Sequence, residues 1–290
     1  MFRMLRAEFY KMYKSRGFKV LCIVAILLGL LNVVMNNVIN EEFLSKSLGT
    51  QVSEEQMDAF INNDSDEIIS PGSLGFHTNG AKDPFNITAV EAFHSSFGSG
   101  IMEILIAVLV GTMVAKEYSE GTIKNTLAYG KNRTSFYIAK FINIIAGSAI
   151  IMAIMTGVTT LGVIITKGWG EQFKFTQLIH MVETFLGAVI VFGAVAAIIM
   201  VISSLVKSNG ATIGISVALF ILLPTMASFL YGAYDWFDKI YELSLFYNSA
   251  LVTAIKASLQ DVIRSMVIGV VTMAIALVAG ITIFRGQDIK

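Results

Sequence analysis

Few residues of this 290-residue chain could do chemistry within its long apolar stretches. Glu103 interrupts the stretch 92–115, and His180 and Glu183 lie three residues apart at the start of another. A charge in hydrocarbon costs several kcal/mol, so such groups normally face a bundle interior or a wet cavity. The three residues are therefore candidates for lining a substrate or proton path. The alternative is a protonated carboxyl or a hydrogen bond between helices that fixes packing; this fits Glu183, near the predicted interface, better than Glu103.

Motifs for catalysis or nucleotide binding are absent from the sequence. The chain has no GxxxxGK[ST] loop, no HExxH motif and no GxSxG elbow. Its one cysteine, Cys22, excludes an intrachain disulfide and a cysteine-based zinc site. We therefore assign no catalytic residue, no metal and no cofactor to this chain.

The elements that must position the candidate residues are predicted to be membrane helices. Apolar residues make up 55% of the chain and charged residues 14%, whereas a soluble domain carries about 25% charge. A span needs about 20 mostly apolar residues, and backbone groups in lipid must be satisfied within the segment. Six stretches meet this requirement: 20–40, 92–115, 141–166, 184–206, 208–234 and 265–284. The sequence predicts one all-α polytopic domain, 1–290, with six transmembrane helices.

The placement of the cations predicts the orientation of these spans. The lead 1–19 and the segment 116–140 together carry eleven Lys and Arg residues, more than the opposite loops do. Cytoplasmic loops are enriched in Lys and Arg, so we expect both termini in the cytoplasm and a location in the plasma membrane. The net charge of zero gives no reason to expect a nucleic-acid partner.

Three segments outside the spans have distinct compositions. The lead 1–19 repeats Phe2, Leu5, Phe9 and Met12 at helical spacing among basic residues; it is either an interfacial helix that contacts a partner or a positive anchor. The segment 41–91 carries ten acids and two bases, as either a folded extracellular cap or a flexible loop. The segment 235–261 begins with aromatic residues, which favour the headgroup region and predict short helices dipping into the outer leaflet.

Small residues and glycines predict close contacts and turns. Gly210, Gly214 and Ala218 form one small-residue face, and Gly193 and Ala197 form another, for contacts within or between chains. Gly210 is also expected to end a helix in the left-handed conformation.

The most informative segment is 116–133, between the second and third spans. Thr122 can cap a short helix that Gly130 ends, with Ile123 and Leu127 four residues apart on one side. Such a helix would present a rigid contact to a soluble partner.

This loop resembles that of the ABC-2 type permeases, in which a glutamate, Gly-Thr, a leucine, a Pro or Gly and an arginine follow in this order. The matching residues are Glu120, Gly121, Thr122, Ile123, Leu127, Gly130 and Arg133. The resemblance extends over nearly the whole chain, through the basic lead, the spans and the aromatic segment before the last span.

The resemblance implies a fold and a set of partners. The lead would be an elbow helix, the loop a coupling helix seated on a separate ATPase, and 235–261 a pair of re-entrant helices. Two ATPase subunits binding ATP and Mg would join two permease chains, this one pairing with an identical copy. The residues expected to couple to the ATPase are Glu117, Glu120, Gly121, Thr122, Ile123, Leu127, Gly130 and Arg133.

Within that family, the sequence is similar to bacterial exporters of amphipathic peptides, such as the phenol-soluble-modulin exporters, and to bacitracin and lantibiotic resistance permeases. Its long first external loop departs from the usual short one. The expected function is export of amphipathic, cationic or antimicrobial peptides, with resistance as one outcome. Two alternatives stay open: an intramembrane hydrolase using Glu103, His94, His180 or Glu183, and a peptide-sensing membrane protein.

Overall fold

The computed structural model describes residues 2–38, 72, 74–78, 80–83, 85–123 and 132–287. Within them the regular elements are helices, and one isolated backbone bridge joins Gly75 to Ser99. The helices are α1 (Phe2–Lys14), α2 (Arg16–Val38), α5 (Ala89–Ser95), α6 (Ile101–Val110), the π-helix η1 (Gly111–Ala115), α7 (Lys116–Ser119), α9 (Arg133–Lys167), α10 (Phe175–Val206), α11 (Asn209–Ser228), α12 (Asp235–Tyr241), α13 (Leu245–Leu251) and α14 (Leu259–Gly286).

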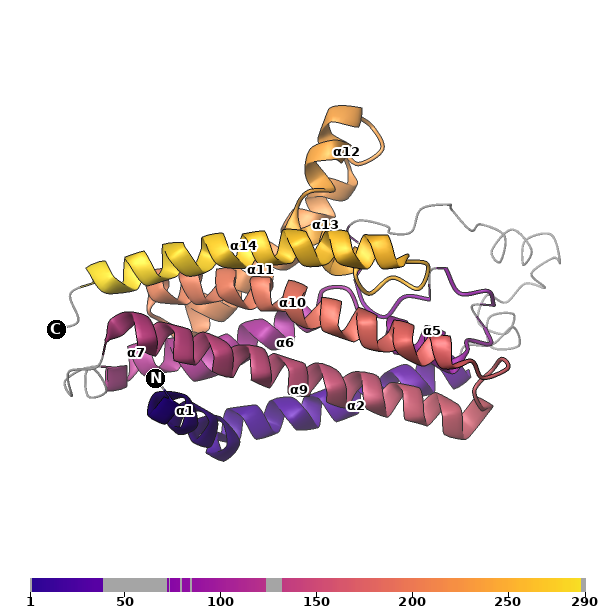
Figure 1. Cartoon of the computed structure of the whole chain (residues 1–290), viewed down its shortest axis with the longest axis horizontal. Helices are drawn as coiled ribbons and strands as arrows, with labels where there is room; N and C mark the ends of the chain where they lie inside the picture. Colours follow the sequence, from indigo (N-terminus) through magenta and orange to yellow (C-terminus); the bar gives the residue numbers. More distant parts are fainter. Residues whose placement is uncertain are drawn as a thin grey trace, which may run out of the picture.

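Five of the described helices are long and apolar enough to cross a membrane: α2, α9, α10, α11 and α14. They lie side by side along the long axis of the molecule, and the start of α1 and the end of α14 lie at the same end (Figure 1). Large apolar side chains such as Leu27, Ile165 and Val278 are exposed on them, as expected where lipid replaces water. The prediction of a helical multi-pass membrane protein is confirmed.

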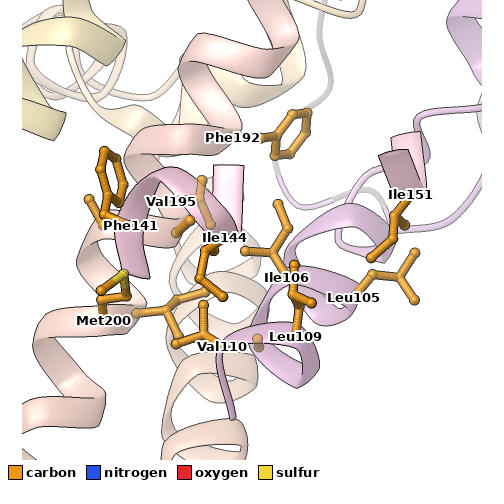
Figure 2. Packing of buried hydrophobic residues seen from close by; sticks show 14 of the residues in the cluster. Leu105, Ile106, Leu109, Val110, Phe141, Ile144, Ile151, Phe192, Val195 and Met200 are labelled. Carbon is orange, nitrogen blue, oxygen red and sulfur yellow. The ribbon is translucent and has the colours of Figure 1, made fainter. Parts of the chain in front are cut away.

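The core of the bundle surrounds α6. Seven of its ten residues are buried, and Figure 2 shows Ile106 and Leu109 of α6 packed near Ile144 of α9 and Phe192 of α10. A helix whose residues are nearly all apolar, as in α6 apart from Glu103, belongs in such an interior. α6 is therefore packed against several of the long helices, so that a movement of these helices would displace it.

The predicted continuous span over 92–115 is wrong, because the structure breaks it. α5 ends at Ser95 and α6 begins at Ile101. Between them Gly98 and Gly100 have φ of +60° and +79°, a conformation that glycine adopts without strain. Ser99 exchanges two backbone hydrogen bonds with Gly75, each of 2.9 Å. α5, α6, η1 and α7 follow one another between the two ends of the bundle (Figure 1).

We call the succession α5–α6–η1–α7 the broken path. Near its end it contains the π-helix η1, at Gly111–Ala115. The N–H of Lys116 bonds to the carbonyl of Gly111, five residues back. A π-helix is rare and is often found at functional sites. Here it passes directly into α7, the start of the predicted coupling segment.

Two predicted boundaries are corrected. The lead helix ends at Lys14 rather than Lys19, because α2 begins at Arg16 and the Ser15 hydroxyl accepts a bond from the Phe18 N–H. The left-handed residue between α10 and α11 is Lys207, with φ of +55°, whereas Gly210 lies inside α11. The helical path already reverses at Lys207, so Gly210 is not needed as a terminator.

Two of the other predicted segments, the acidic loop and the coupling segment, are described only in part. Residues 41–71 of the acidic loop and the coupling residues Leu127 and Gly130 lie outside the described residues. The end of the predicted loop forms the start of α5, where Thr88 and Glu91 make a capping box. In the segment 235–261, α12 and α13 are short helices, and α12 projects away from the bundle (Figure 1). Their re-entry into the membrane stays a prediction.

Candidate functional site

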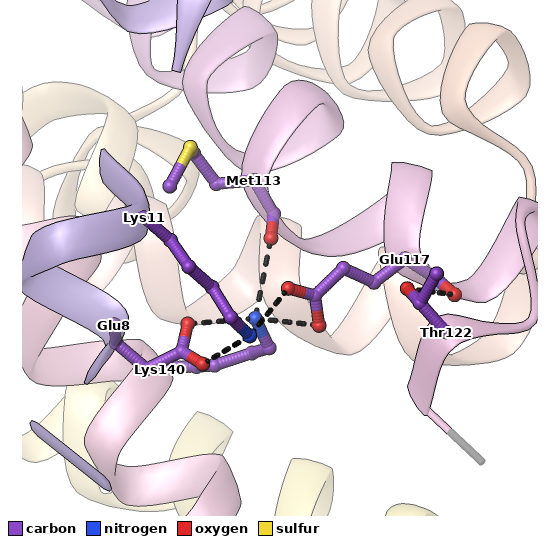
Figure 3. Close-up of polar contacts among 6 residues, drawn as sticks. All are labelled: Glu8, Lys11, Met113, Glu117, Thr122 and Lys140. Carbon is purple, nitrogen blue, oxygen red and sulfur yellow. Dashed lines mark hydrogen bonds and ion pairs between the residues drawn. The ribbon is translucent and has the colours of Figure 1, made fainter. Parts of the chain in front are cut away.

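Four charged side chains meet where α1, α7 and α9 converge (Figure 3). The Lys140 Nζ lies 2.9 Å from Glu8 Oε2 and 2.8 Å from Glu117 Oε2. The Lys11 Nζ lies 2.8 Å from Glu8 Oε1 and 3.2 Å from Glu117 Oε1. The two cations and two anions thus form a closed ring of ion pairs. We call Glu8, Lys11, Glu117 and Lys140 the charge cluster.

The helical periodicity of α1 brings Glu8 into this cluster. Met4, Glu8 and Met12 are the buried residues of α1 and recur every four positions, which places them on one face. Lys140 is a buried residue of α9, and Glu117 is the second residue of α7, directly after η1. Of the lead residues expected to be apolar contacts, Met12 is buried, Leu5 and Phe9 are half-buried, and Phe2 is exposed.

Burial makes the pairing of these charges necessary. The side chains of Lys140 and Glu8 are each 4% exposed, whereas that of Glu117 is 17% and that of Lys11 is 43% exposed. A buried charge without a partner costs several kcal/mol. Lys140 also donates to the carbonyl of Met113 in η1, at 3.3 Å. The cluster therefore ties η1 as well as α7 to α9.

The same geometry shifts the pKa values of the two groups on α1. Burial alone would raise the pKa of the Glu8 carboxyl, but attraction to Lys140 and the hydrogen bonds from Lys11 and Lys140 outweigh it, so the pKa is lowered. Burial alone would lower the pKa of Lys11, but the hydrogen bond to Glu8 and the charges of Glu117 and Glu8 raise it. Both groups are held in their charged forms.

α7 also contacts the helices on the other side of the bundle. The Tyr118 hydroxyl donates to the Ser204 hydroxyl of α10 at 3.3 Å. The Asn209 N–H at the start of α11 donates to the Ser119 hydroxyl at 3.3 Å. The ring of Tyr118 lies edge-on to that of Phe284 in α14, with the centroids 6.2 Å apart. A displacement of this four-residue helix would reach α1, α9, α10, α11 and α14.

The predicted coupling residues after α7 occupy different environments. Glu120 is exposed and pairs with Lys116 at 3.6 Å. Gly121 has φ of +67° and turns the chain. The exposed Thr122 hydroxyl donates to the Glu117 carbonyl at 3.4 Å, and Ile123 is buried in the core. Within 120–123, the side chain of Ile123 is therefore packed in the core, whereas Glu120 and Thr122 are exposed.

Arg133 lies at the start of α9 and binds the end of α14. Its Nη1 donates to the carbonyls of Arg285, at 2.9 Å, and Gln287, at 2.7 Å. Cations near a helix C-terminus satisfy its free carbonyls. Arg133 therefore connects the start of α9 to the end of α14. Its contact with an ATPase stays a prediction.

The three predicted path residues lie on α6 and α10, outside the charge cluster. Glu103, in the first turn of α6, accepts a hydrogen bond from the Ser249 hydroxyl of α13 at 3.2 Å. The His180 Nδ1 of α10 lies 3.7 Å from Glu183 Oε2, as their spacing predicts. The ring centroids of His180 and His94 are 5.5 Å apart. The structure thus joins His180 and Glu183 to each other and to His94, and gives Glu103 a separate partner.

Three members of the charge cluster were missing from the residues expected at the site. Glu8 and Lys140 are 132 positions apart, and Lys11 and Lys140 stood out only as cations that set the orientation. One signal was present, because Glu8 is the single acid in the basic lead 1–19. A lone acid on the buried face of such a helix indicates a buried cationic partner.

Comparison with known proteins agrees with this architecture. A family model described as ABC-2 family transporter protein matches residues 3–289. The chain belongs to the ABC-2 transporter family. It is also similar to the uncharacterized protein YhcI of Bacillus subtilis (strain 168), with 24% identity over 152 residues. That match covers 48% of each chain, so it spans about half the length of this relative.

The family model extends over nearly the whole chain, from residue 3 to residue 289. This confirms the family expected from the segment 116–133. Glu117 of the charge cluster lies on α7, the described helix that opens that segment.

Proposed function

We propose that this permease exports amphipathic or cationic peptides across a bacterial plasma membrane. In this proposal two copies of a separate ATPase subunit bind ATP with Mg²⁺ and contact the segment 116–133. The broken path α5–α7 is the sixth membrane crossing, and the enrichment of Lys and Arg in 1–19 and 116–140 supports a cytoplasmic position for both termini.

The observation that carries the coupling role is the ring of ion pairs around Lys140. Glu117 is fixed to α1 through Lys11 and to α9 through Lys140. A push of the ATPase on 116–123 would therefore move α7 together with the starts of α1 and α9 rather than bend the loop alone. Such discrete rearrangement of packed elements is how small shifts become large ones.

The length of α9 supports transmission towards the ATPase. Its 35 residues span ~52 Å at 1.5 Å per residue, and the hydrocarbon core is ~30 Å thick. Lys140 lies in its second turn. The first turns of α9 therefore have the reach to lie outside the hydrocarbon, where the charge cluster is placed in this proposal.

A second, identical permease chain is part of the proposal. A methyl group added at Gly210 or Gly214 of α11 would meet no atom of a neighbouring element within 4 Å in the described part of the chain. A methyl group at Gly193 would instead lie 3.0 Å from Met273 of the same chain. Small residues let helices approach closely in membranes, so the open face of α11 is suited to a contact between chains.

The substrate assignment rests on the resemblance to peptide exporters and on the acidity of the loop 41–91, which carries a net charge of −8. A cationic peptide would be attracted by such a loop. The hydrolase alternative lacks support in the described part of the chain, where His94 bonds to the Thr253 carbonyl at 3.2 Å and not to a hydroxyl.

The test compares ATP hydrolysis with peptide uptake in inverted vesicles that contain the complete permease–ATPase complex. Glu117→Gln is expected to keep ATP hydrolysis and to reduce uptake of a cationic amphipathic peptide about tenfold, which is a typical size for coupling between sites. The matched control is Glu171→Gln, which removes an exposed ion pair with Lys82 in the loop before α10. Unchanged uptake in Glu117→Gln would contradict the coupling role, and indifference of the wild type to peptide would contradict the substrate.

A further inference from the structure

A small cavity lies next to the break between α5 and α6. Its volume is about 40 Å³, whereas one water-sized group needs roughly 10–15 Å³. Residues of α6, α10, α11, α12 and α13 line it, together with Gly72 and Leu74. Leu74 is 49% exposed, so the cavity lies close to the surface at this point.

Glu103 brings to this cavity an acid that has no counter-charge among the described residues. The residue is 7% exposed and lines the cavity wall. Its Oε1 accepts the Ser249 hydroxyl, but its Oε2 has no hydrogen-bond partner among the described residues. None of the ion pairs in the described part of the chain involves Glu103. A buried carboxylate in this position favours a cation from outside the chain.

The remaining walls define the kind of cation. Six aromatic side chains line the cavity: Phe97, Phe192, Phe220, Tyr241, Phe246 and Tyr247. Aromatic faces attract ammonium groups, more strongly where water is excluded. Ca²⁺ or Mg²⁺ would need about six oxygen ligands or more, and the described residues hold no group of three or more His, Cys, Asp or Glu side chains placed to bind a metal ion. The apolar walls also suit the methylene groups next to an amine.

We propose that this cavity binds a primary ammonium group on an alkyl chain, with Glu103 as its counter-ion. The amine has two possible sources, a lysine or N-terminus of the exported peptide and an amine headgroup of a lipid. Only the peptide source rests on the proposed function. Binding is therefore measured on the permease without its ATPase, so that the two proposals can fail separately.

The probe is n-hexylammonium, titrated calorimetrically into the permease in an uncharged maltoside detergent at mildly alkaline pH. We expect saturable binding to the wild type and at least roughly tenfold weaker binding to Glu103→Gln, equivalent to about 1.4 kcal/mol. The control Asp235→Asn removes an exposed acid outside the cavity and should bind as the wild type does. Equal binding to Glu103→Gln, or no saturable binding to the wild type, would overturn the proposal.

A second variant separates charge from folding and shape. Ser249→Ala keeps the carboxylate of Glu103 and removes only its hydroxyl donor, so the affinity should stay within about threefold of the wild type. If Ser249→Ala abolishes binding, or if 1-hexanol displaces the amine, the cavity recognises shape rather than charge and the proposal fails.

Competition identifies the source of the amine. Displacement by a lysine-containing amphipathic peptide, but not by its fully acetylated form, would support the peptide. Displacement by phosphatidylethanolamine would support a lipid headgroup. Both results support the ammonium site, and only the first connects it to export.

Discussion

At the scale of single residues, Lys140 holds the charge cluster together. Its ammonium contacts Glu8, Glu117 and the Met113 carbonyl, and it lies 5.2 Å from the centroid of the Phe136 ring. Nearly all of its side chain is buried. Removal of either carboxylate leaves the buried cation with a single anion.

A double-mutant cycle tests this interdependence. Glu8→Gln and Lys140→Met should each lower the free energy of unfolding by ~3 kcal/mol, because each leaves a buried charge with too few partners. The double variant should cost little more than one single change, since both charges are then gone. The measurement is unfolding of the permease in detergent, followed by circular dichroism.

The control for this cycle is Lys11→Met, whose side chain is 43% exposed and which should cost less than about 1 kcal/mol. Additive effects of Glu8→Gln and Lys140→Met would mean that the two residues stabilise the protein independently.

The pKa shifts on α1 predict a pH window for stability. The pKa of Glu8 lies below its reference value of 4.5, so its contribution is present above that value and is lost as the pH falls through the lowered pKa. The pKa of Lys11 lies above its reference value of 10.5, so its contribution is present below that value and is lost as the pH rises through the raised pKa. The cluster should therefore be fully stabilising between these two reference values.

Thermal unfolding as a function of pH measures this window. The stability of the wild type should fall more steeply at acid pH than that of Glu8→Gln/Lys140→Met. If the stability of the two proteins fell equally steeply at acid pH, Glu8 would not contribute to the pH dependence of stability.

Of the four residues in the charge cluster, the sequence predicted only Glu117 as a site residue. Glu117 belongs to a recognisable motif segment and was expected to couple. Its partners lie on α1 and α9, far away along the chain, and only the fold brings them together.

At the scale of elements, the path α5–α6–η1–α7 differs most from expectation. The hydropathy of 92–115 correctly predicts an apolar segment. It contains no information on the backbone angle φ, and glycine alone does not predict a break because it is tolerated in membrane helices. The left-handed Gly98 and Gly100 break the helix. The long spans α9, α10 and α14 were predicted well because their length and composition alone decide them.

η1 packs closely on α11, and this contact can be tested with one methyl group. A Cβ at Gly111 would lie 2.6 Å from both Asn209 Oδ1 and Ile213 Cγ1. Gly111→Ala should therefore lower the free energy of unfolding by about 1–3 kcal/mol, the usual cost of overpacking. The matched control is Gly157→Ala in α9, where a Cβ meets no described atom of another element within 4 Å.

The control should be neutral or slightly stabilising, because alanine is the better helix former. The midpoint of thermal unfolding in detergent reports both changes. Equal midpoints for the two variants would show that η1 and α11 separate without cost.

At the scale of the whole molecule, family, topology and charge placement agree. The family match extends over residues 3–289. The start of α1 and the end of α14 lie at one end of the bundle (Figure 1), and the charge cluster lies where α1 meets the starts of α7 and α9. The central claim is that the segment after α7 contacts the ATPase at this end.

The most direct test is photocrosslinking in intact membranes that contain both subunits. A benzoylphenylalanine replaces Thr122, an exposed residue shortly after the end of α7, and in a control it replaces Lys174, an exposed residue just before α10. We expect a covalent adduct with the ATPase from position 122 and none from position 174. An adduct from position 174 alone, or none from position 122 while the complex hydrolyses ATP, would contradict the account.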